Sequence, residues 1–317
     1  MNKAENVLLT IVIPVFNEEA TLRALYQKIA EVMNSMSSTE YEIIFIDDGS
    51  TDDSWQQICQ VHSRAPKQVR GFKFRKNFGK ASALALGFAE SKGEIVFTLD
   101  ADLQDDPQNI PLFIEKIGSG WDVVSGWKRE RKDPLEKKIP SKIFNFFVSL
   151  TTGLKLNDMN CGFKAYKKDV LHHIYLYGEL HRFIPILALN AGFSVTEVPV
   201  THFPRKFGAS KYGWERYLKG FLDLLTVLFI TRFLQRPLHF FGLGGIVTGV
   251  AGGAILFFLS INKIFFGVNI EARPLFFLGI LCILFSGQLL SLGFLGELIN
   301  RLIFKPDESA KVSQRIG

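Results

Sequence analysis

Four short apolar runs in the first hundred residues each end in a cluster of polar side chains, and this repeat constrains the fold most. The runs are rich in Val and Ile, and stretches of helical composition separate them. β-Branched runs of about four to eight residues predict strands, and strands that alternate with helices predict a parallel, doubly wound sheet. The expected strands are Leu8–Val15, Tyr41–Ile46, Val69–Phe74 and Glu94–Leu99, with later strands at Asp122–Ser125 and Phe193–Val200.

The loops that follow these strands are the expected place for a ligand. In doubly wound sheets, ligands bind beyond the C-terminal ends of the strands. The polar clusters at these ends are Asn17–Glu18, Asp47–Asp48, Asn77–Lys80 and Asp100–Gln104. The glycines match neither the dinucleotide-binding fingerprint nor the phosphate-binding loop of ATPases, which argues against those two classes of enzyme.

The fourth polar cluster contains two carboxylates two residues apart. Asp100 and Asp102 are followed by Gln104, and in an extended backbone all three side chains point to the same side. Carboxylate and amide oxygens suit Mg²⁺ or Mn²⁺, which keep further positions for water and phosphates. A solvated loop without function has the same short motif, so the motif gains its weight from the other polar strand ends. Lys80, near the start of a helix, adds a cation for a phosphate.

The composition indicates an anionic partner and a membrane. The formal net charge is +6 and the isoelectric point is about 9.1, which suits lipid headgroups or a phosphorylated substrate. Nucleic acid is excluded as the partner because the basic residues lie beside apolar stretches and form no recognition motif. Cys59, Cys161 and Cys282 show no metal-ligand spacing and are expected to be free thiols.

Two long apolar runs near the C-terminus predict transmembrane helices. They cover about 238–261 and 274–296, and roughly 20 apolar residues are enough to cross a bilayer. Buried helices of a soluble protein are the alternative. The basic residues that flank the pair place both chain ends in the cytoplasm under the positive-inside rule. These residues are Arg232, Arg236, Arg301 and Lys305.

Two other stretches combine apolar and basic residues at helical spacing. The first covers about 137–151 and the second 213–235, and both patterns predict helices on a membrane surface. The first pattern also fits an ordinary amphipathic helix that packs on the sheet. The expected organisation is a cytoplasmic catalytic domain at 1–212, the amphipathic helix at 213–235 and a membrane domain at 236–317.

Taken in this order, the motifs resemble those of family 2 glycosyltransferases of the dolichol-phosphate mannose synthase type. Within that type the chain is most similar to bacterial GtrB-like polyprenyl-phosphate glucosyltransferases. The resemblance implies a GT-A fold that binds nucleotide sugars. The matching segments are Ile13–Glu18, Asp47–Asp52, Arg75–Lys80, Asp100–Asp105 and Arg205–Lys211. The chain departs from the family at Cys161–Lys164, where Ser-Gly-Phe-Arg is common.

The resemblance also implies roles for individual residues. The nucleotide pocket would be lined by Pro14, Asn17, Glu18, Asp47 and Asp48. The metal and the diphosphate would be bound by Asp100, Asp102 and Gln104. A loop that closes over the phosphates would contain Arg205, Ser210 and Lys211, with Lys128 and Arg131 as further phosphate contacts. Asp158 matches a candidate base that would orient the acceptor or take its proton, although a structural loop residue is an equal alternative.

The implied reaction is the inverting transfer of glucose from UDP-glucose to a polyprenyl phosphate such as undecaprenyl phosphate, with Mg²⁺ or Mn²⁺ as cofactor. It would take place at the cytoplasmic face of the bacterial inner membrane. GDP-mannose or UDP-GlcNAc is the alternative donor, and a non-catalytic, membrane-anchored nucleotide-binding protein is the alternative of another class. Expected protein partners are a second copy of the chain, and a flippase or a downstream glycosyltransferase.

Overall fold

The structure is a computed structural model of the whole chain and divides into two compact units, Met1–Val227 and Leu228–Gly317. It describes residues 8–36, 40–128, 149, 153–178, 180–204, 225–226, 229, 233, 236–267, 269 and 274–303. The expected helices at 137–151 and 213–235 lie largely outside these residues, so they stay predictions.

The first unit is built around a seven-stranded sheet with the order β3-β2-β1-β4-β6-β5-β7. Its strands are β1 (Leu8–Val15), β2 (Glu40–Asp47), β3 (Val69–Lys73), β4 (Ile95–Thr98), β5 (Val123–Lys128), β6 (Lys164–Lys167) and β7 (Val195–Val200). Only β6 is antiparallel to its neighbours, β4 and β5. The remaining pairs are parallel, which confirms the predicted, mainly parallel α/β architecture.

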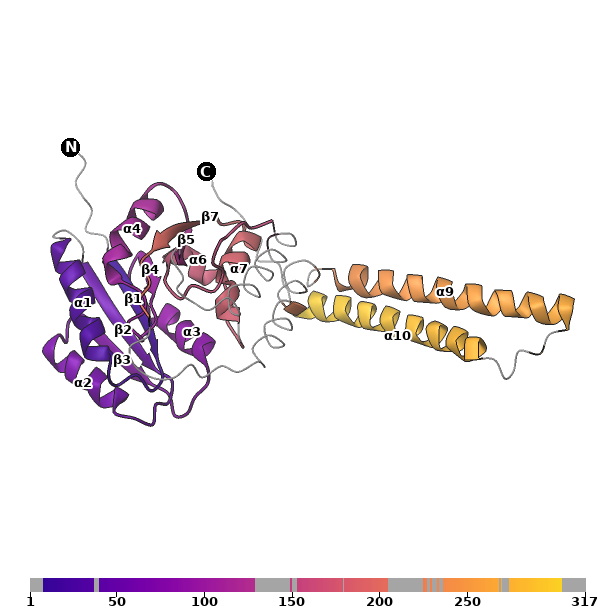
Figure 1. Cartoon of the computed structure of the whole chain (residues 1–317), viewed down its shortest axis with the longest axis horizontal. Coiled ribbons are helices and arrows are strands. Elements are labelled where there is room, and N and C mark those ends of the chain that lie inside the picture. The colour runs from indigo at the N-terminus through magenta and orange to yellow at the C-terminus, as the bar shows by residue number, and fades with distance from the viewer. Residues whose placement is uncertain are drawn as a thin grey trace. The chain divides into compact units, whose positions relative to one another are not determined.

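Helices cover both faces of this sheet (Figure 1). They are α1 (Leu22–Ser35), α2 (Ser54–Arg64), α3 (Lys80–Glu90), α4 (Ile110–Gly118), α6 (Lys168–His172) and α7 (Ile184–Asn190), with 3₁₀ turns η1 (Pro107–Asn109) and η2 (Leu180–Phe183). α1, α2 and α4 bury their apolar stripes against one face, where alternate residues of β1 such as Leu9, Ile11 and Ile13 are fully buried. α3 and α7 cover the other face (Figure 1).

The ends of the predicted strands agree with the structure to within about three residues, the largest difference being at the end of β5, and β6 is the strand that was not predicted. No strand was expected at Lys164–Lys167 because two of its four residues are lysines and the apolar alternation is too short. In the structure this segment fills the space between β4 and β5 and pairs with both. A strand buried by neighbours on each side can therefore carry residues that local composition assigns to a loop.

The pairing between β1 and β4 stops before β1 ends. Residues Leu9–Val12 of β1 pair with β4, whereas the last three residues of β1 pair with β2 alone. Pro14 lies in this extension, where the missing N–H of proline is tolerated because β1 has a partner on one side only. The chain turns to β2 on one side of β1 and to β4 on the other, so this is the switch point at which such sheets bind ligands.

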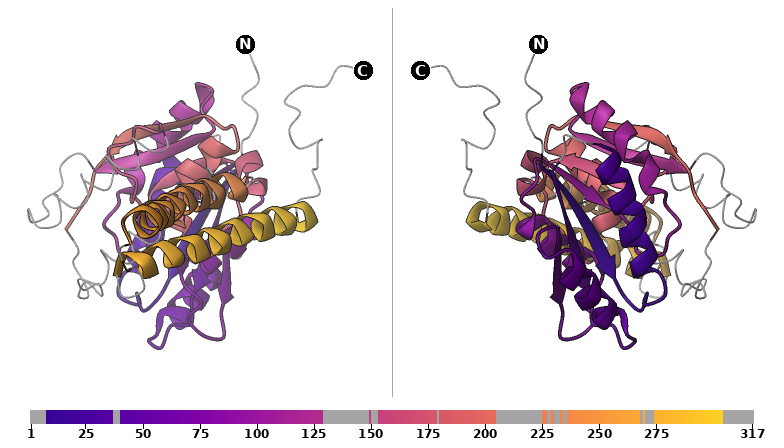
Figure 2. Two further views of the ribbon diagram at one scale, coloured as in Figure 1. Left: turned by 90° about the vertical axis from the view of Figure 1, so that its right-hand side faces the viewer. Right: turned by 90° about the vertical axis from the view of Figure 1, so that its left-hand side faces the viewer.

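The second unit contains the two long apolar helices α9 (Pro237–Phe266) and α10 (Pro274–Ile303). Both are long and apolar enough to cross a membrane, and most of their side chains are exposed rather than buried in a protein core. The helices lie side by side (Figures 1 and 2). Gly249 of α9 faces Ser286 of α10, whose Oγ donates a 2.6 Å hydrogen bond to the carbonyl oxygen of Gly245. Small residues and an interhelical hydrogen bond are typical of close packing between membrane helices.

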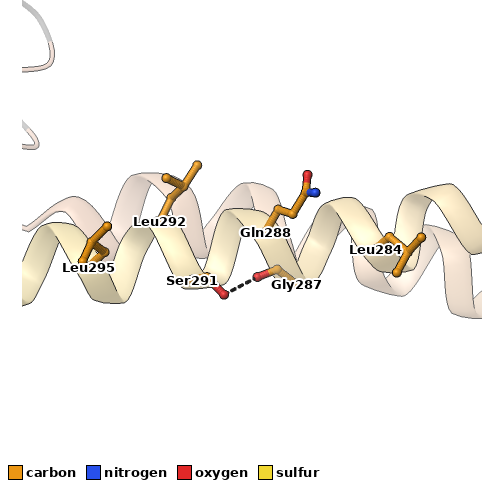
Figure 3. A pocket seen from close by; sticks show the side chains of 6 residues that line it. All are labelled: Leu284, Gly287, Gln288, Ser291, Leu292 and Leu295. Carbon is orange, nitrogen blue, oxygen red and sulfur yellow. Dashed lines mark hydrogen bonds between the residues drawn. The ribbon is translucent and has the colours of Figure 1, made fainter.

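A shallow groove runs along α10 (Figure 3). Its lining residues are Leu284, Gly287, Gln288, Ser291, Leu292 and Leu295. The hydroxyl of Ser291 donates to the carbonyl oxygen of Gly287 at 2.8 Å, so it is engaged within its own helix. The lining of the groove includes no charged side chain.

Gly87 in the middle of α3 allows this helix to pack closely on β1. A Cβ at this position would lie 2.2 Å from Cγ1 of Val12, so Gly87→Ala must push the helix away from the sheet. Overpacking costs about 1–3 kcal/mol, which exceeds the gain of roughly 1 kcal/mol in helix propensity. We expect thermal unfolding to show a lower Tm than for the control Gly118→Ala in α4, where a Cβ meets open space. An equal or higher Tm for Gly87→Ala would contradict this packing.

Candidate functional site

The C-terminal ends of β1, β2, β3, β4, β5 and β7 lie at one edge of the sheet, together with the start of the antiparallel β6. The polar clusters singled out in the sequence follow these ends, so the fold brings segments far apart in the chain to a common edge.

Hydrogen bonds from side chains to backbone join the loops after β1 and β2. The backbone N–H of Asn17 donates to Oγ of Ser50 at 3.0 Å, and the N–H of Thr51 donates to Oδ1 of Asn17 at 2.9 Å. Asn17 adopts φ 55°, a left-handed conformation that Asn tolerates better than most residues. The predicted nucleotide-pocket residue Asn17 therefore also fixes the geometry of the loop. The backbone N–H of Glu18 is held in the same way, by Oγ of Ser54 at 2.9 Å.

The two carboxylates at the end of β2 are buried and hold backbone groups. Both oxygens of Asp48 accept hydrogen bonds from the loop before α3, from the N–H of Phe78 at 2.7 Å and of Gly79 at 2.9 Å. Burial raises the pKa of Asp48 above its ordinary value and outweighs these hydrogen bonds, which lower it. Oδ1 of Asp47 accepts from the N–H of Ser50 at 2.8 Å. Whether either carboxylate also contacts a nucleotide stays a prediction.

Asp100 forms an ion pair with Lys80, the first residue of α3. Burial would raise the pKa of Asp100, but the Lys80 ammonium outweighs it and holds the pKa at about 2. Gly162, just before β6, allows this arrangement because a Cβ there would lie 2.4 Å from Oδ2 of Asp100. The carbonyl oxygen of Gly162 accepts from Oγ1 of Thr98 at 2.8 Å, which fixes it at the end of β4. Asp100 is thus an ionised carboxylate with a permanent counter-charge.

The loop from Asp100 to Gln104 is a turn, so the extended backbone assumed for the two carboxylates is wrong. β4 ends at Thr98, and Leu103 adopts φ 60°, which is uncommon for a residue other than glycine. The backbone N–H of Gln104 donates to Oδ1 of Asp102 at 3.2 Å, and its side-chain amide donates to the carbonyl oxygen of Phe203 at 3.4 Å. Strained backbone of this kind persists only where the surroundings hold it.

The oxygen atoms of this loop fit a divalent cation that is shared with a substrate. Carboxylate and amide oxygens are the hard donors that Mg²⁺ and Mn²⁺ take. Within the described part of the chain, no three His, Cys, Asp or Glu side chains gather closely enough to hold a metal by themselves. Mg²⁺ is usually bound by one or two carboxylates together with phosphate oxygens. The predicted ligands Asp100, Asp102 and Gln104 therefore suit a site that a diphosphate completes.

Buried groups beside Asp100 were partly missed in the sequence. Asp158 was expected and is buried, with its Oδ1 accepting from the N–H of Asn160 at 3.2 Å. Lys164 is buried as well, its ammonium donates to the carbonyl oxygen of Cys161, and burial lowers its pKa. His181 of η2 gave no signal in the sequence. Burial, with help from nearby cations, lowers its pKa to about 2, and its buried Nδ1 has no hydrogen-bond partner among the described residues.

Lys128, expected to bind phosphate, forms an ion pair with Asp105 at 3.2 Å. Burial would lower the pKa of Lys128, but Asp105 and more distant carboxylates outweigh it and raise the pKa, so the lysine stays charged. Asp105 lies in a loop and is nevertheless buried, which its sequence context does not indicate. The other predicted phosphate-binding residues lie outside the described part of the chain. These are Arg131, Arg205, Ser210 and Lys211.

The burial of Cys161 can be tested by thiol labelling. The Cys161 side chain has no exposed surface and burial raises the pKa of its thiol to about 12, whereas Cys59 is exposed. Only the thiolate reacts, and at pH 8 roughly one Cys161 in 10,000 is ionised. In a Cys282→Ala background we expect a maleimide to add one label to the native chain and two after denaturation, by mass spectrometry. Two labels on the native chain would show that Cys161 is accessible.

Comparisons with known proteins agree with this fold and site. The family model described as "Glycosyl transferase family 2" matches residues 10–175. The dodecaprenyl-phosphate galacturonate synthase of Rhizobium johnstonii is 35% identical over 309 residues, which cover 96% of this chain and 91% of the relative. The undecaprenyl-phosphate 4-deoxy-4-formamido-L-arabinose transferase of Klebsiella pneumoniae is 34% identical and covers 92% of this chain and 88% of its own.

A solved structure shows the same fold. Glucosyl-3-phosphoglycerate synthase from Mycobacterium tuberculosis, in complex with Mn²⁺ and UDP-glucose, superposes with a TM-score of 0.54 at 18% identity. The match covers 72% of this chain and 80% of that protein. The GT-A fold expected from the sequence is therefore confirmed, as is the resemblance to glycosyltransferases. The family model and the two relatives that match nearly the whole chain show that this protein belongs to glycosyl transferase family 2 and is a glycosyltransferase.

Proposed function

We propose that the protein transfers a hexose from a UDP-sugar to a polyprenyl phosphate, with inversion at the anomeric carbon, and that UDP-glucose is the donor. A polyprenyl phosphate is proposed as the acceptor because nearly the whole chain is similar to transferases named for dodecaprenyl and undecaprenyl phosphate. The loop Asp100–Gln104 lies at the switch point and has the carboxylate and amide oxygens that would hold the cation of a bound diphosphate.

In the proposed reaction a phosphate oxygen of the lipid attacks the anomeric carbon in line and UDP leaves. Phosphate is already largely ionised near neutral pH, so the acceptor has little need of a strong base. Asp158 would orient the acceptor or take a residual proton. Lys80 would attract the diphosphate. Its ammonium also pairs with Asp100 and keeps that carboxylate ionised.

Mg²⁺ or Mn²⁺ fits the same loop, where Asp102 and Gln104 would hold it with Asp100 close by. When bound, the cation supplies positive charge against the departing diphosphate. The residues themselves contribute positioning, because Gln104 is tied to Phe203 and Asp100 to Lys80 before any substrate arrives. Such fixed dipoles and charges need no rearrangement during the reaction.

The two apolar helices support a location in the bacterial inner membrane. Helices of 30 residues are about 45 Å long, which exceeds the roughly 30 Å of the hydrocarbon core. We infer that α9 and α10 cross the bilayer and that the catalytic unit and both chain ends lie in the cytoplasm, where nucleotide sugars are available. The basic residues that flank the helices support this orientation. We also retain the expected boundaries of the catalytic domain, the juxtamembrane helix and the membrane domain at residues 212 and 235.

UDP-galacturonate is the second candidate donor because the Rhizobium relative is named for galacturonate transfer. To decide, the purified full-length protein in undecaprenyl-phosphate liposomes is given labelled UDP-glucose, UDP-galacturonate, UDP-GlcNAc or GDP-mannose with Mn²⁺. We expect label in the lipid fraction with UDP-glucose, and with the other donors at less than about a tenth of that rate. Faster transfer from UDP-galacturonate would replace the proposed sugar. No transfer from any donor would favour a non-catalytic, nucleotide-binding role.

The expected role of the Asp100–Gln104 loop in metal binding can be tested by removing one carboxylate. Asp102→Ala should lower transfer by at least about 100-fold, since lost stabilisation of a leaving group costs that much in other enzymes. The protein should still fold and insert into membranes, which circular dichroism and the Tm report. Asp169→Ala is the matched control because Asp169 is an exposed carboxylate at the opposite edge of the sheet, after β6. Full activity of Asp102→Ala would contradict the metal assignment.

A further inference from the structure

A buried polar cluster lies directly beside the Asp100–Gln104 loop, and its central carboxylate has no role in the reaction described so far. Its centre is Asp105, which is only 2% exposed and follows Gln104 in the chain. Oδ1 of Asp105 lies 3.2 Å from Nζ of Lys128 and 3.2 Å from Nδ1 of His202. Oδ2 is buried and has no hydrogen-bond partner among the described residues. A buried carboxylate is costly unless it is paired, so this position is maintained by its two partners.

The three residues of this cluster come from three segments. Asp105 ends the loop after β4, Lys128 is the last residue of β5, and His202 follows β7. The backbones meet as well, because Asp105 and His202 form an isolated antiparallel bridge. The N–H of Phe203 donates to the carbonyl oxygen of Gln104 at 2.8 Å, next to the contact between the Gln104 amide and Phe203. The segment after β7 is therefore joined through His202 and Phe203 to Gln104 and Asp105, at the end of the Asp100–Gln104 loop.

This fastening explains how the unusual backbone of the loop is maintained. Leu103 adopts φ 60° between the end of β4 and the bridge at Asp105. Such a conformation persists only if both sides are fixed. One side is fixed by the sheet, and the other by the charge of Asp105 between a lysine and a histidine. The charge of Asp105 thus adds to the hydrogen bonds that join Gln104 to Asp102 and Phe203.

We propose that Asp105 is a positioning residue for the transfer reaction: it fixes the Asp100–Gln104 loop against the segment that follows β7. Lys128 serves in this arrangement as its counter-charge. The inference rests on the proposed function for its kinetic readout, and on the structure alone for the connection between the two segments.

The test compares Asp105→Asn with Asp122→Asn in the full-length protein. Asparagine keeps the size of the side chain and removes its charge. Asp122 is a matched control because it also pairs with a lysine, Lys167 at 2.8 Å, and joins a loop through Ser194, but at the opposite edge of the sheet. Both variants should have a lower Tm. Transfer kinetics and the Mn²⁺ concentration for half-maximal activity are measured below the lower Tm, and hydrogen exchange is followed in peptides that contain Gln104 and Phe203.

For Asp105→Asn we expect kcat to fall, or the required Mn²⁺ concentration to rise, by about 10- to 100-fold, the usual effect of removing a group that orients a metal ligand. Exchange at Gln104 and Phe203 should also be faster, while Asp122→Asn keeps normal kinetics and exchange at these residues. Unchanged kcat and Mn²⁺ requirement in Asp105→Asn, with only Tm lowered, would reduce Asp105 to a structural role and overturn the proposal. If the wild type transfers no sugar, the proposed function fails, and unchanged exchange would then overturn the positioning as well.

Discussion

The end of pairing between β1 and β4 is the constraint on which the rest of the site depends. Past Val12 and Thr98 the two strands share no further ladder, and the chain on each side must find other partners for its backbone. It does so with side chains, because Ser50, Asn17 and Asp48 accept hydrogen bonds from backbone N–H groups that have no partner in the sheet. The polar residues at the strand ends thus replace the sheet where it stops, and they leave a loop edge whose geometry is fixed.

Several of these features could be predicted from the sequence, because they depend on local patterns. The strands that alternate with helices can be predicted from runs of β-branched residues. The two long helices can be predicted from the length of the apolar runs and their lack of charge. The edge at which Asp100 lies follows from the rule for strand order in doubly wound sheets. The ion pair of Asp100 with Lys80 joins two polar clusters that the sequence had separately assigned to this edge.

The remaining features depend on contacts between distant segments, which no local pattern encodes. β6 is a strand because β4 and β5 need a partner between them, and Lys164 is buried there despite its charge. Asp105 stands in a polar loop between the half-buried Gln104 and Asp106, and it is buried because it pairs with Lys128 and His202, which lie 23 and 97 positions later in the chain. His181 is likewise defined by what packs around it. Buried polar groups in irregular segments are therefore the part of such a site that is hardest to predict from the sequence.

The balance of charge at this edge bears on how a nucleotide sugar can bind. Lys80 and Lys128 are each paired with a carboxylate, and Nζ of Lys73 lies 3.8 Å from Oδ2 of Asp47, so each of these three lysines already has an anionic neighbour. A diphosphate would bring more negative charge to the same edge, which a cation, the release of Lys80 from Asp100, or the basic residues expected to bind phosphate would have to offset. If a cation is used, donor and metal each raise the affinity of the other by the same factor. The loop that bears Asp102 must then already have the right shape, which gives the buried charge of Asp105 its importance.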